Sequence, residues 1–143
     1  MGTRADFYVG EGKDAEWLGS IAWDGYPSND VLHNIFRSQS EEQYRSEVSK
    51  MLSGRKDDAT LPEMGWPWPW EDSRTTDYSY SFQNNRVMAS GFGYAWFDPF
   101  DGGAEDKENY KEGDKLIFPN MKDRMNATLG PRSGLIILTS PKH

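Results

Sequence analysis

The feature that most restricts the fold of this chain is the unbroken run Trp-Pro-Trp-Pro-Trp at residues 66–70, which holds three of the six tryptophans. Each proline fixes its own φ, lacks a backbone N–H and biases the preceding residue towards extended geometry. The run can therefore be neither a helix nor a central strand, and we expect a stiff, polyproline-like ribbon that carries three large rings. Such a ribbon either covers the core or displays a binding surface, and the sequence leaves both options open.

The length and the composition predict one folded domain over residues 1–143. A chain of this size can bury roughly two-thirds of its unfolded surface, which is enough for a core without metals or disulfides. The absence of cysteine excludes disulfides, thiolate metal sites and cysteine nucleophiles. No apolar stretch reaches the roughly 18 residues of a membrane span, and the N-terminus lacks a signal-peptide pattern. We therefore expect a cytoplasmic protein without a membrane partner.

The charge distribution disfavours direct contact with nucleic acid. The net charge is −7, whereas binding to a phosphate backbone depends on lysines and arginines. The acidity is concentrated at residues 98–114, which hold seven aspartates and glutamates and only two lysines. Most of the net charge is therefore predicted to lie in one loop.

Apolar and aromatic patterns predict five or six β-strands. They lie at residues 5–9, 17–23, 75–82, 86–92, 115–118 and 135–138, and residues 94–97 could extend the fourth. The last strand is apolar on both faces, which is typical of a central strand. The glycines between the first two strands are interpreted as a hairpin turn, because the spacing of a phosphate-binding loop is absent.

The third and fourth of these strands are predicted to form the best-defined hairpin, because Asn84 and Asn85 tolerate the positive φ of a two-residue turn. This turn sets a register that pairs Phe82 with Val87, Tyr80 with Ala89 and Tyr78 with Gly91. The opposite face is far more polar and carries Ser79, Ser81, Met88 and Ser90. We expect one face to pack on the core and the other to meet water or a ligand.

The clearest helix begins at Ser40, whose hydroxyl can cap the first turn while Gln43 completes a capping box. Apolar residues follow at helical spacing until Gly54, namely Tyr44, Val48, Met51 and Leu52. Ser28 or Asn29 is expected to cap a shorter helix that shares an apolar face of Val31, Leu32, Ile35 and Phe36.

These elements predict an α+β domain. We expect a twisted, mainly antiparallel sheet of five or six strands, with one main helix at about residues 40–53 packed on one face.

Catalytic motifs are scarce, which favours a binding protein over an enzyme. Of the two histidines, His143 ends the sequence, and His33 is more simply interpreted as a surface residue of the short helix. No serine lies in a Gly-x-Ser-x-Gly elbow. We therefore predict no catalytic residue, no metal ligand and no cofactor.

The candidate binding residues lie in two aromatic segments with adjoining charges and in the acidic loop. They are Trp66, Trp68, Trp70, Asp72, Arg74, Tyr94, Trp96, Asp98, Asp101, Glu105 and Asp106. If the two aromatic segments converge, they form an aromatic-walled site with a few polar groups, as in a ligand pocket or an interface hot spot. The last four residues could also hold calcium or magnesium, but EF-hand spacing is absent and a solvated loop is favoured.

Three stretches of the sequence, residues 2–10, 17–25 and 66–70, resemble those of small uncharacterised proteins from bacteriophages and prophages. The similarity spans most of the chain. No activity is assigned to that group, so the resemblance transfers no functional residue. It implies an accessory factor that acts by binding a component of the bacterial host cell.

Three functional hypotheses remain open. The first is a non-enzymatic phage protein that inhibits a host or antiphage-defence factor, in the manner of an anti-CRISPR, through an acidic and aromatic surface. The second is a binder of a nucleotide-like small molecule, in which rings sandwich a base while Arg4, Arg74 or Arg132 meets a phosphate. The third and least favoured is a hydrolase that uses carboxylates, with or without a metal. The oligomeric state is left open.

Overall fold

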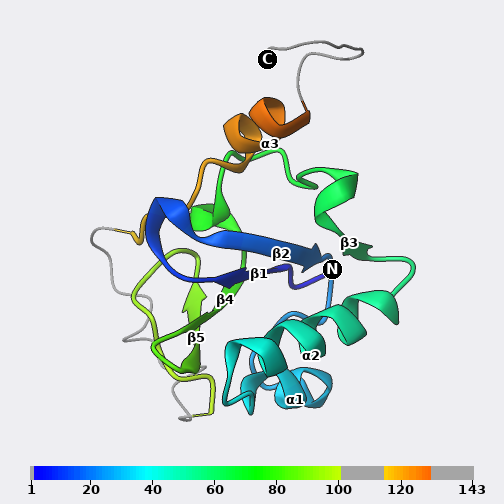
Figure 1. The fold of residues 1–143 in the computed structure, drawn as a ribbon, viewed down its shortest axis with the longest axis vertical. Helices are drawn as coiled ribbons and strands as arrows, with labels where there is room; N and C mark the ends of the chain where they lie inside the picture. Colours follow the sequence, from blue (N-terminus) through cyan, green and yellow to red (C-terminus); the bar gives the residue numbers. More distant parts are fainter. Residues whose placement is uncertain (1, 101–114, 130–143) are drawn as a thin grey trace.

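A computed structural model describes residues 2–100 and 115–129, and every structural statement below concerns these residues. Five strands form one mixed sheet in the order β3-β2-β1-β4-β5 (Figure 1). Their bounds are β1 Ala5–Val9, β2 Glu16–Ile21, β3 Ala59–Thr60, β4 Tyr78–Gln83 and β5 Arg86–Gly91. Three pairings are antiparallel and β1 with β4 is parallel. The predicted α+β domain with a mainly antiparallel sheet is therefore confirmed.

Three α-helices accompany the sheet in the described part of the chain: α1 His33–Phe36, α2 Glu41–Ser53 and α3 Met121–Leu129. The described residues also form four short 3-10 helices: η1 Gly12–Asp14, η2 Asp30–Leu32, η3 Pro62–Met64 and η4 Ser73–Thr75. Figure 1 shows α1 and α2 on one side of the sheet and α3 on the other. The molecule therefore has three layers, with the sheet in the middle.

The main core lies between the sheet and the helices α1 and α2. It contains the sheet residues that alternate with the polar ones, and the buried faces of both helices. Its buried members include Phe7, Ile21, Leu32, Ile35, Phe36, Tyr44, Val48, Tyr80 and Phe82. The predicted helical faces are confirmed except at Val31, which is 60% exposed.

A second, smaller core lies on the opposite face of the sheet. Its buried residues are Tyr8, Ala15, Trp17, Phe118 and Met121, and Trp66, Trp96, Leu116 and Met125 pack against them. Arg124 ties α3 to the β1–β2 connection by donating to the carbonyl oxygens of Ala15 and Lys13 at 2.6 and 2.7 Å. The tryptophan ribbon and α3 therefore help to bury this face.

The predicted hairpin between β4 and β5 is confirmed in turn and register. Asn84 and Asn85 have φ of 53° and 66°, and the three predicted cross-strand pairs are the observed ones. The polar face of this hairpin was predicted to meet water or a ligand. The prediction that it meets water is wrong. Ser79, Ser81 and Ser90 are all 0% exposed, because this face lies beneath the third layer.

Two further segments that were predicted to be strands, residues 115–118 and 94–97, differ from the prediction. Residues 115–118 form no strand, because their Phe118 packs into the second core instead of joining the sheet. Of the segment 94–97, only Phe97 pairs with the sheet, through an isolated bridge to Ala89. The predicted strand at 135–138 lies outside the described residues.

A β-bulge interrupts the pairing of β1 with β2. Phe7 pairs with Gly19 and Tyr8 with Trp17, so Leu18 is the extra residue. Gly19 has a φ of +146°, and a Cβ there would lie 2.6 Å from Leu52 Cδ1. This glycine lets β2 pass close to helix α2.

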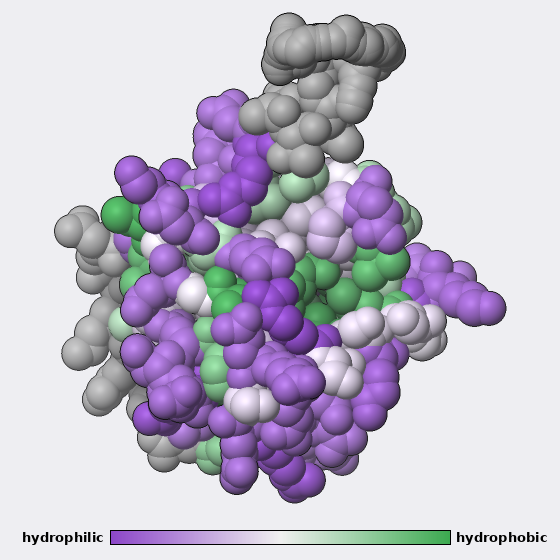
Figure 2. All heavy atoms as spheres, in the orientation of Figure 1, coloured by the Kyte–Doolittle hydropathy of each residue, from purple (hydrophilic) through white to green (hydrophobic). Residues whose placement is uncertain are grey.

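The outer edge of β2 is covered by the chain itself. The strand β3 pairs with its last two residues, and η3 contacts it further along. Figure 2 shows the same side of the molecule as Figure 1, with apolar side chains gathered over β2 and β3 among hydrophilic ones. This edge is not an open template for another strand.

The cap of α2 gives a first testable prediction. The Ser40 side chain accepts a hydrogen bond from the backbone N–H of Gln43 at 3.1 Å, and the Gln43 side chain accepts one from Gln39 N–H at 3.0 Å. Ser40→Ala should lower the free energy of unfolding by about 1 kcal/mol, because the backbone N–H of Gln43 loses its acceptor. Urea denaturation measures this, with exposed Ser49→Ala in the same helix as the control. An equal effect of both substitutions would contradict the capping role.

Candidate functional site

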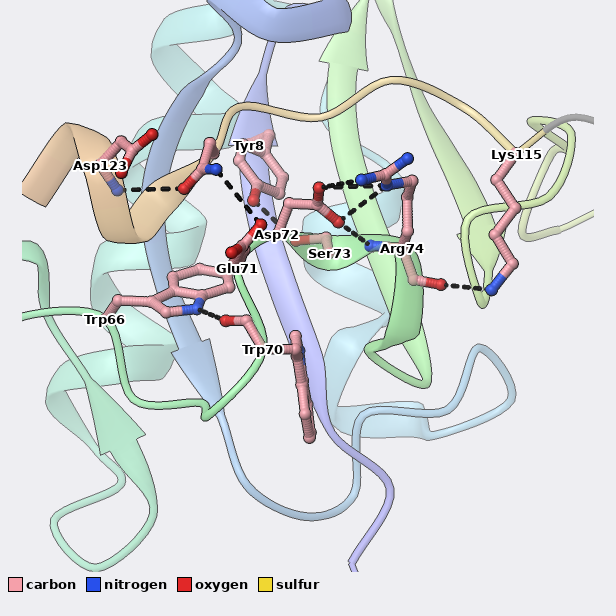
Figure 3. A network of polar contacts seen from close by, with 10 residues as sticks. Tyr8, Trp66, Trp70, Glu71, Asp72, Ser73, Arg74, Lys115 and Asp123 are labelled. Carbon is pink, nitrogen blue, oxygen red and sulfur yellow. Dashed lines mark hydrogen bonds and ion pairs between the residues drawn. The ribbon is translucent and has the colours of Figure 1, made fainter.

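The tryptophan ribbon is neither a fully buried lid nor a displayed edge. All three rings are half-buried, and every indole N–H donates a hydrogen bond within the chain. Trp66 donates to the backbone oxygen of Trp70 at 2.7 Å, Trp68 to Asp6 Oδ1 at 2.7 Å and Trp70 to Thr76 Oγ1 at 2.9 Å. Figure 3 shows the first of these bonds. The ribbon is thus fixed on the sheet while part of each ring reaches solvent.

Trp66 belongs to the second core. Its ring meets Trp17 edge-on, with the centroids 5.1 Å apart. Trp96 packs on the same core through Phe118, at 5.9 Å. The two aromatic segments that the sequence placed in the site therefore approach one core through Trp66 and Trp96, and these two rings support the fold.

Trp68 and Trp70 form a different unit together with Arg4, which we call the tryptophan ledge. The two rings are stacked, with centroids 5.6 Å apart and planes inclined by 18°. The Arg4 guanidinium lies 5.8 Å from one centroid and 5.6 Å from the other, within the range of a cation–π contact. Arg4 also faces Asp77 at 3.6 Å and stays 43% exposed. The ledge is a preformed aromatic and cationic surface.

Asp6 is the anchor of this ledge. It is 0% exposed in the middle of β1 and accepts hydrogen bonds from Ser20 Oγ and Ser73 Oγ at 2.5 Å, besides the one from Trp68. Burial raises the pKa of Asp6, and these donors, with Thr76, lower it in part. The carboxyl group therefore joins the sheet, the ribbon and η4 at one point. We call Asp6 with Ser20, Trp68 and Ser73 the Asp6 cluster.

The polar contacts continue beyond the Asp6 cluster. The Tyr8 hydroxyl lies 2.6 Å from Ser73 Oγ. When Asp6 is ionised, Ser73 gives its own hydrogen to the carboxylate, so Tyr8 donates to Ser73. Burial raises the pKa of Tyr8 well above its usual range. In the neighbouring strand Ser79 pairs with Asp6, and within residues 2–100 and 115–129 its buried hydroxyl has no hydrogen-bond partner. A row of buried polar side chains thus crosses the sheet under the ribbon.

Asp72 and Arg74 lie together on the same side of the molecule. Asp72 caps η4 by accepting from Arg74 N–H at 2.9 Å, and its carboxylate pairs with the Arg74 guanidinium at 2.8 Å (Figure 3). Lys115 donates to the Arg74 carbonyl oxygen at 2.9 Å and lies 5.3 Å from the centre of the Tyr94 ring. Arg74 remains 52% exposed. Two guanidinium groups, Arg4 and Arg74, therefore border the stretch that leads into β4.

Phe92 lies beside this stretch in a strained conformation. Its φ is +52°, a region that a bulky side chain rarely adopts, and its ring is 43% exposed. The backbone N–H of Phe92 donates to the backbone carbonyl oxygen of Asp77 at 3.1 Å. Strain of this kind without burial is more frequent at functional sites than elsewhere. Phe92 is therefore the strongest addition to the candidate surface.

The remaining predicted site residues lie elsewhere. Asp98 pairs with Arg86 at 2.7 Å and accepts from Phe100 N–H at 2.8 Å, so it closes a turn behind β5. Asp101, Glu105 and Asp106 lie outside the described residues. In the described ranges, no three histidine or acidic side chains are placed to hold a metal ion. In the same ranges no helix is long and apolar enough to cross a bilayer.

The sequence reasoning missed Asp6 and Phe92, and it considered Arg4 only as a contact for a phosphate. Asp6 carries a usable signal, since aspartate is depleted inside strands and here stands between Ala5 and Phe7. An acid at such a position is expected to have donors aimed at it. Phe92 has no comparable signal, because a positive φ at a phenylalanine is not predictable from its neighbours.

Comparison with known proteins gives no family for this chain, because no family model, no curated protein and no solved structure matches it.

Proposed function

We propose that this protein is a non-enzymatic binding protein and that the tryptophan ledge is the centre of its recognition surface. The observation that carries the proposal is the stacked Trp68–Trp70 pair with Arg4 above it, held from below by Asp6 and Thr76. Tryptophan and arginine are the residue types most enriched among binding hot spots. The two indoles are already fixed, so a partner would lose little conformational entropy in contacting them.

Phe92 and Arg74 extend the proposed surface. Both are largely exposed, and the chain segment between Arg74 and Asp77 connects them to Arg4 through the contacts at Asp77. A central aromatic and arginine cluster with charged side chains around it is the usual anatomy of an interface. The surface is aromatic and carries two ion pairs, Arg4 with Asp77 and Arg74 with Asp72.

The proposed partner is a host protein in the cytoplasm of a bacterial cell, such as an antiphage-defence factor. The resemblance of residues 2–10, 17–25 and 66–70 to small phage and prophage proteins supports this class. The acidic residues 98–114 would add steering towards a basic partner. This contribution should depend on salt.

The test captures host proteins from bacterial lysate with the wild type and then measures the affinity of each captured protein for variants. Trp70→Ala and Arg4→Ala should each weaken binding by about 10-fold or more, and the double variant by about 30-fold or more, because ledge contacts are lost. Trp23→Ala is the matched control, since Trp23 is 45% exposed but lies outside the ledge. Unchanged affinity in the double variant would remove the ledge from the site. Capture of no host protein at low and at high salt would end the proposal.

A second candidate function is binding of a small nucleotide-like anion, favoured by the Arg4 guanidinium beside the rings. The centroid distance of 5.6 Å in the Trp68–Trp70 pair is too short for a base between them, since two stacking distances amount to about 7 Å. A base could therefore stack only on an outer face, as on single-stranded nucleic acid platforms. Calorimetry with a nucleotide panel distinguishes the two candidate functions. In the second, the purified protein should bind a nucleotide without any protein partner, and Arg4→Ala should abolish this binding.

A further inference from the structure

Asp6 is a buried carboxyl group with hydrogen-bond donors but no cation. Among the described residues its partners are hydroxyl and indole groups, and no lysine, arginine or histidine pairs with it. A carboxylate without exposure has lost its hydration, and three neutral donors replace it only in part. The protonation state of Asp6 should therefore have a large effect on the free energy of burying it beneath the segment that covers it.

The donors to Asp6 come from two separate parts of the molecule. Ser20 lies on β2 and remains beside Asp6 as long as the sheet exists. Trp68 and Ser73 belong to the segment that passes over the sheet from η3 to β4. If this segment lifts, Asp6 loses two donors and gains water. The ribbon thus covers Asp6, and the charge of the carboxyl group can affect whether the ribbon stays on the sheet.

The donors also differ in chemistry. A serine hydroxyl can rotate and accept a hydrogen bond, whereas an indole N–H can only donate. A neutral Asp6 could donate its proton to Ser73, whose hydroxyl can rotate to accept it, and still accept from Trp68 through its carbonyl oxygen. The neutral group can therefore be satisfied with the ribbon seated.

We propose that the proton on Asp6 controls the seating of the tryptophan ledge: neutral Asp6 keeps Trp68 on the sheet, and ionised Asp6 favours a lifted ribbon in which water reaches the carboxylate. This inference deepens the proposed function, on which its biological meaning rests, because it adds a regulation of the same site. The ledge would be a proton-dependent surface.

The direction of the effect follows from linkage. Burial raises the pKa of Asp6 in the seated state above its usual value of 3.8, while an exposed carboxyl group in the lifted state keeps the usual value. The seated state therefore binds the proton more tightly, so seating is favoured as the pH falls through the raised pKa. Above that pKa the full cost of the buried charge acts against seating.

Ionisable groups lie around this region on several of the elements packed around Asp6. β2 and β4 contribute only the neutral Ser20 and Ser79 next to it. The ionisable groups are Tyr8 on β1, Arg4 and Asp77 beside the ledge, Asp72 and Arg74 around η4, and Arg124 on α3. A titration of the ledge that comes from the other acids would survive replacement of Asp6.

The test follows the Trp68 ring by 19F NMR in the full chain labelled with 5-fluorotryptophan, from about pH 4 to about pH 9. Trp68→Phe assigns the resonance. We expect the wild-type resonance to titrate and the Asp6→Asn resonance to stay at the low-pH position, because an amide is neutral and can both accept from Trp68 and donate to a serine. The experiment needs no partner, so its failure and the failure of the proposed function are distinguishable.

A second variant keeps the proposal testable if Asp6→Asn does not fold. Ser20→Ala removes one donor to the carboxylate, so the midpoint of the Trp68 titration should move to higher pH than in the wild type. A wild-type resonance without titration would overturn the proposal. The same holds for a titration that persists in Asp6→Asn or for a midpoint that Ser20→Ala leaves unchanged.

Discussion

Asp6→Ala is expected to lower the free energy of unfolding at neutral pH by about 3 kcal/mol, one of the largest single effects in this chain. The substitution leaves the buried donors Ser20, Ser73 and Trp68 without their acceptor. Each unsatisfied donor costs roughly 1–3 kcal/mol, and relief of the buried charge offsets part of the sum. Asp6→Asn should differ from the wild type by only about 1 kcal/mol, because its side-chain oxygen still accepts.

Urea denaturation of the wild type and both variants measures this difference. Asp57→Ala is the control, since Asp57 is exposed and should change the free energy by no more than about 0.5 kcal/mol. Near-UV circular dichroism should report loosened tryptophans in Asp6→Ala, because Trp68 loses its hydrogen bond. A stability of Asp6→Ala equal to that of the wild type would refute the anchoring role.

Gly19→Ala is expected to destabilise the protein to a similar extent, about 3 kcal/mol. A φ of +146° is accessible almost only to glycine. Backbone strain at this φ should cost an alanine roughly 1–3 kcal/mol of folding free energy. The new Cβ would also lie 2.8 Å from the Thr60 backbone oxygen and 2.6 Å from Leu52 Cδ1. Because the first of these atoms belongs to β3, either the edge strand or the α2 packing must shift.

Gly12→Ala separates the two causes. Gly12 has a φ of +76°, but a Cβ there meets nothing within 4 Å. Its substitution should therefore cost only about 1 kcal/mol, from the backbone alone. Thermal unfolding of both variants tests the difference. If both variants lose the same stability, the contact of β2 with α2 and β3 does not restrict this position.

The local elements of this fold could be predicted from the sequence because short-range chemistry decides them. Asn84 and Asn85 require one kind of turn, and the turn sets the register of β4 with β5. Ser40 and Gln43 mark the start of α2 in the same way. The helix α3 was missed although Asn120 accepts from Asp123 N–H at 3.0 Å, because a cap followed by few apolar residues is a weak signal.

The features that could not be predicted depend on residues far apart in the chain. The polar face of the hairpin looked solvated, yet it is buried because a distant segment brings donors to Asp6 across 62 to 67 positions. Serines on a buried face of a sheet cannot be distinguished in the sequence from serines on a face that meets water. For the same reason the half-burial of the ribbon could not be decided from the ribbon itself.

The parallel pairing of β1 with β4 has a consequence for how the chain acquires its structure. The opening hairpin of β1 and β2 can form as soon as residue 21 is available, but the other side of β1 waits for residues 78–82. Contacts of such separation form late, since a long loop must close first. Asp6 should therefore remain hydrated in a chain that is still being synthesised and lose its water only when β4 and the ribbon arrive. Closure of the tryptophan ribbon would then be the last step of folding.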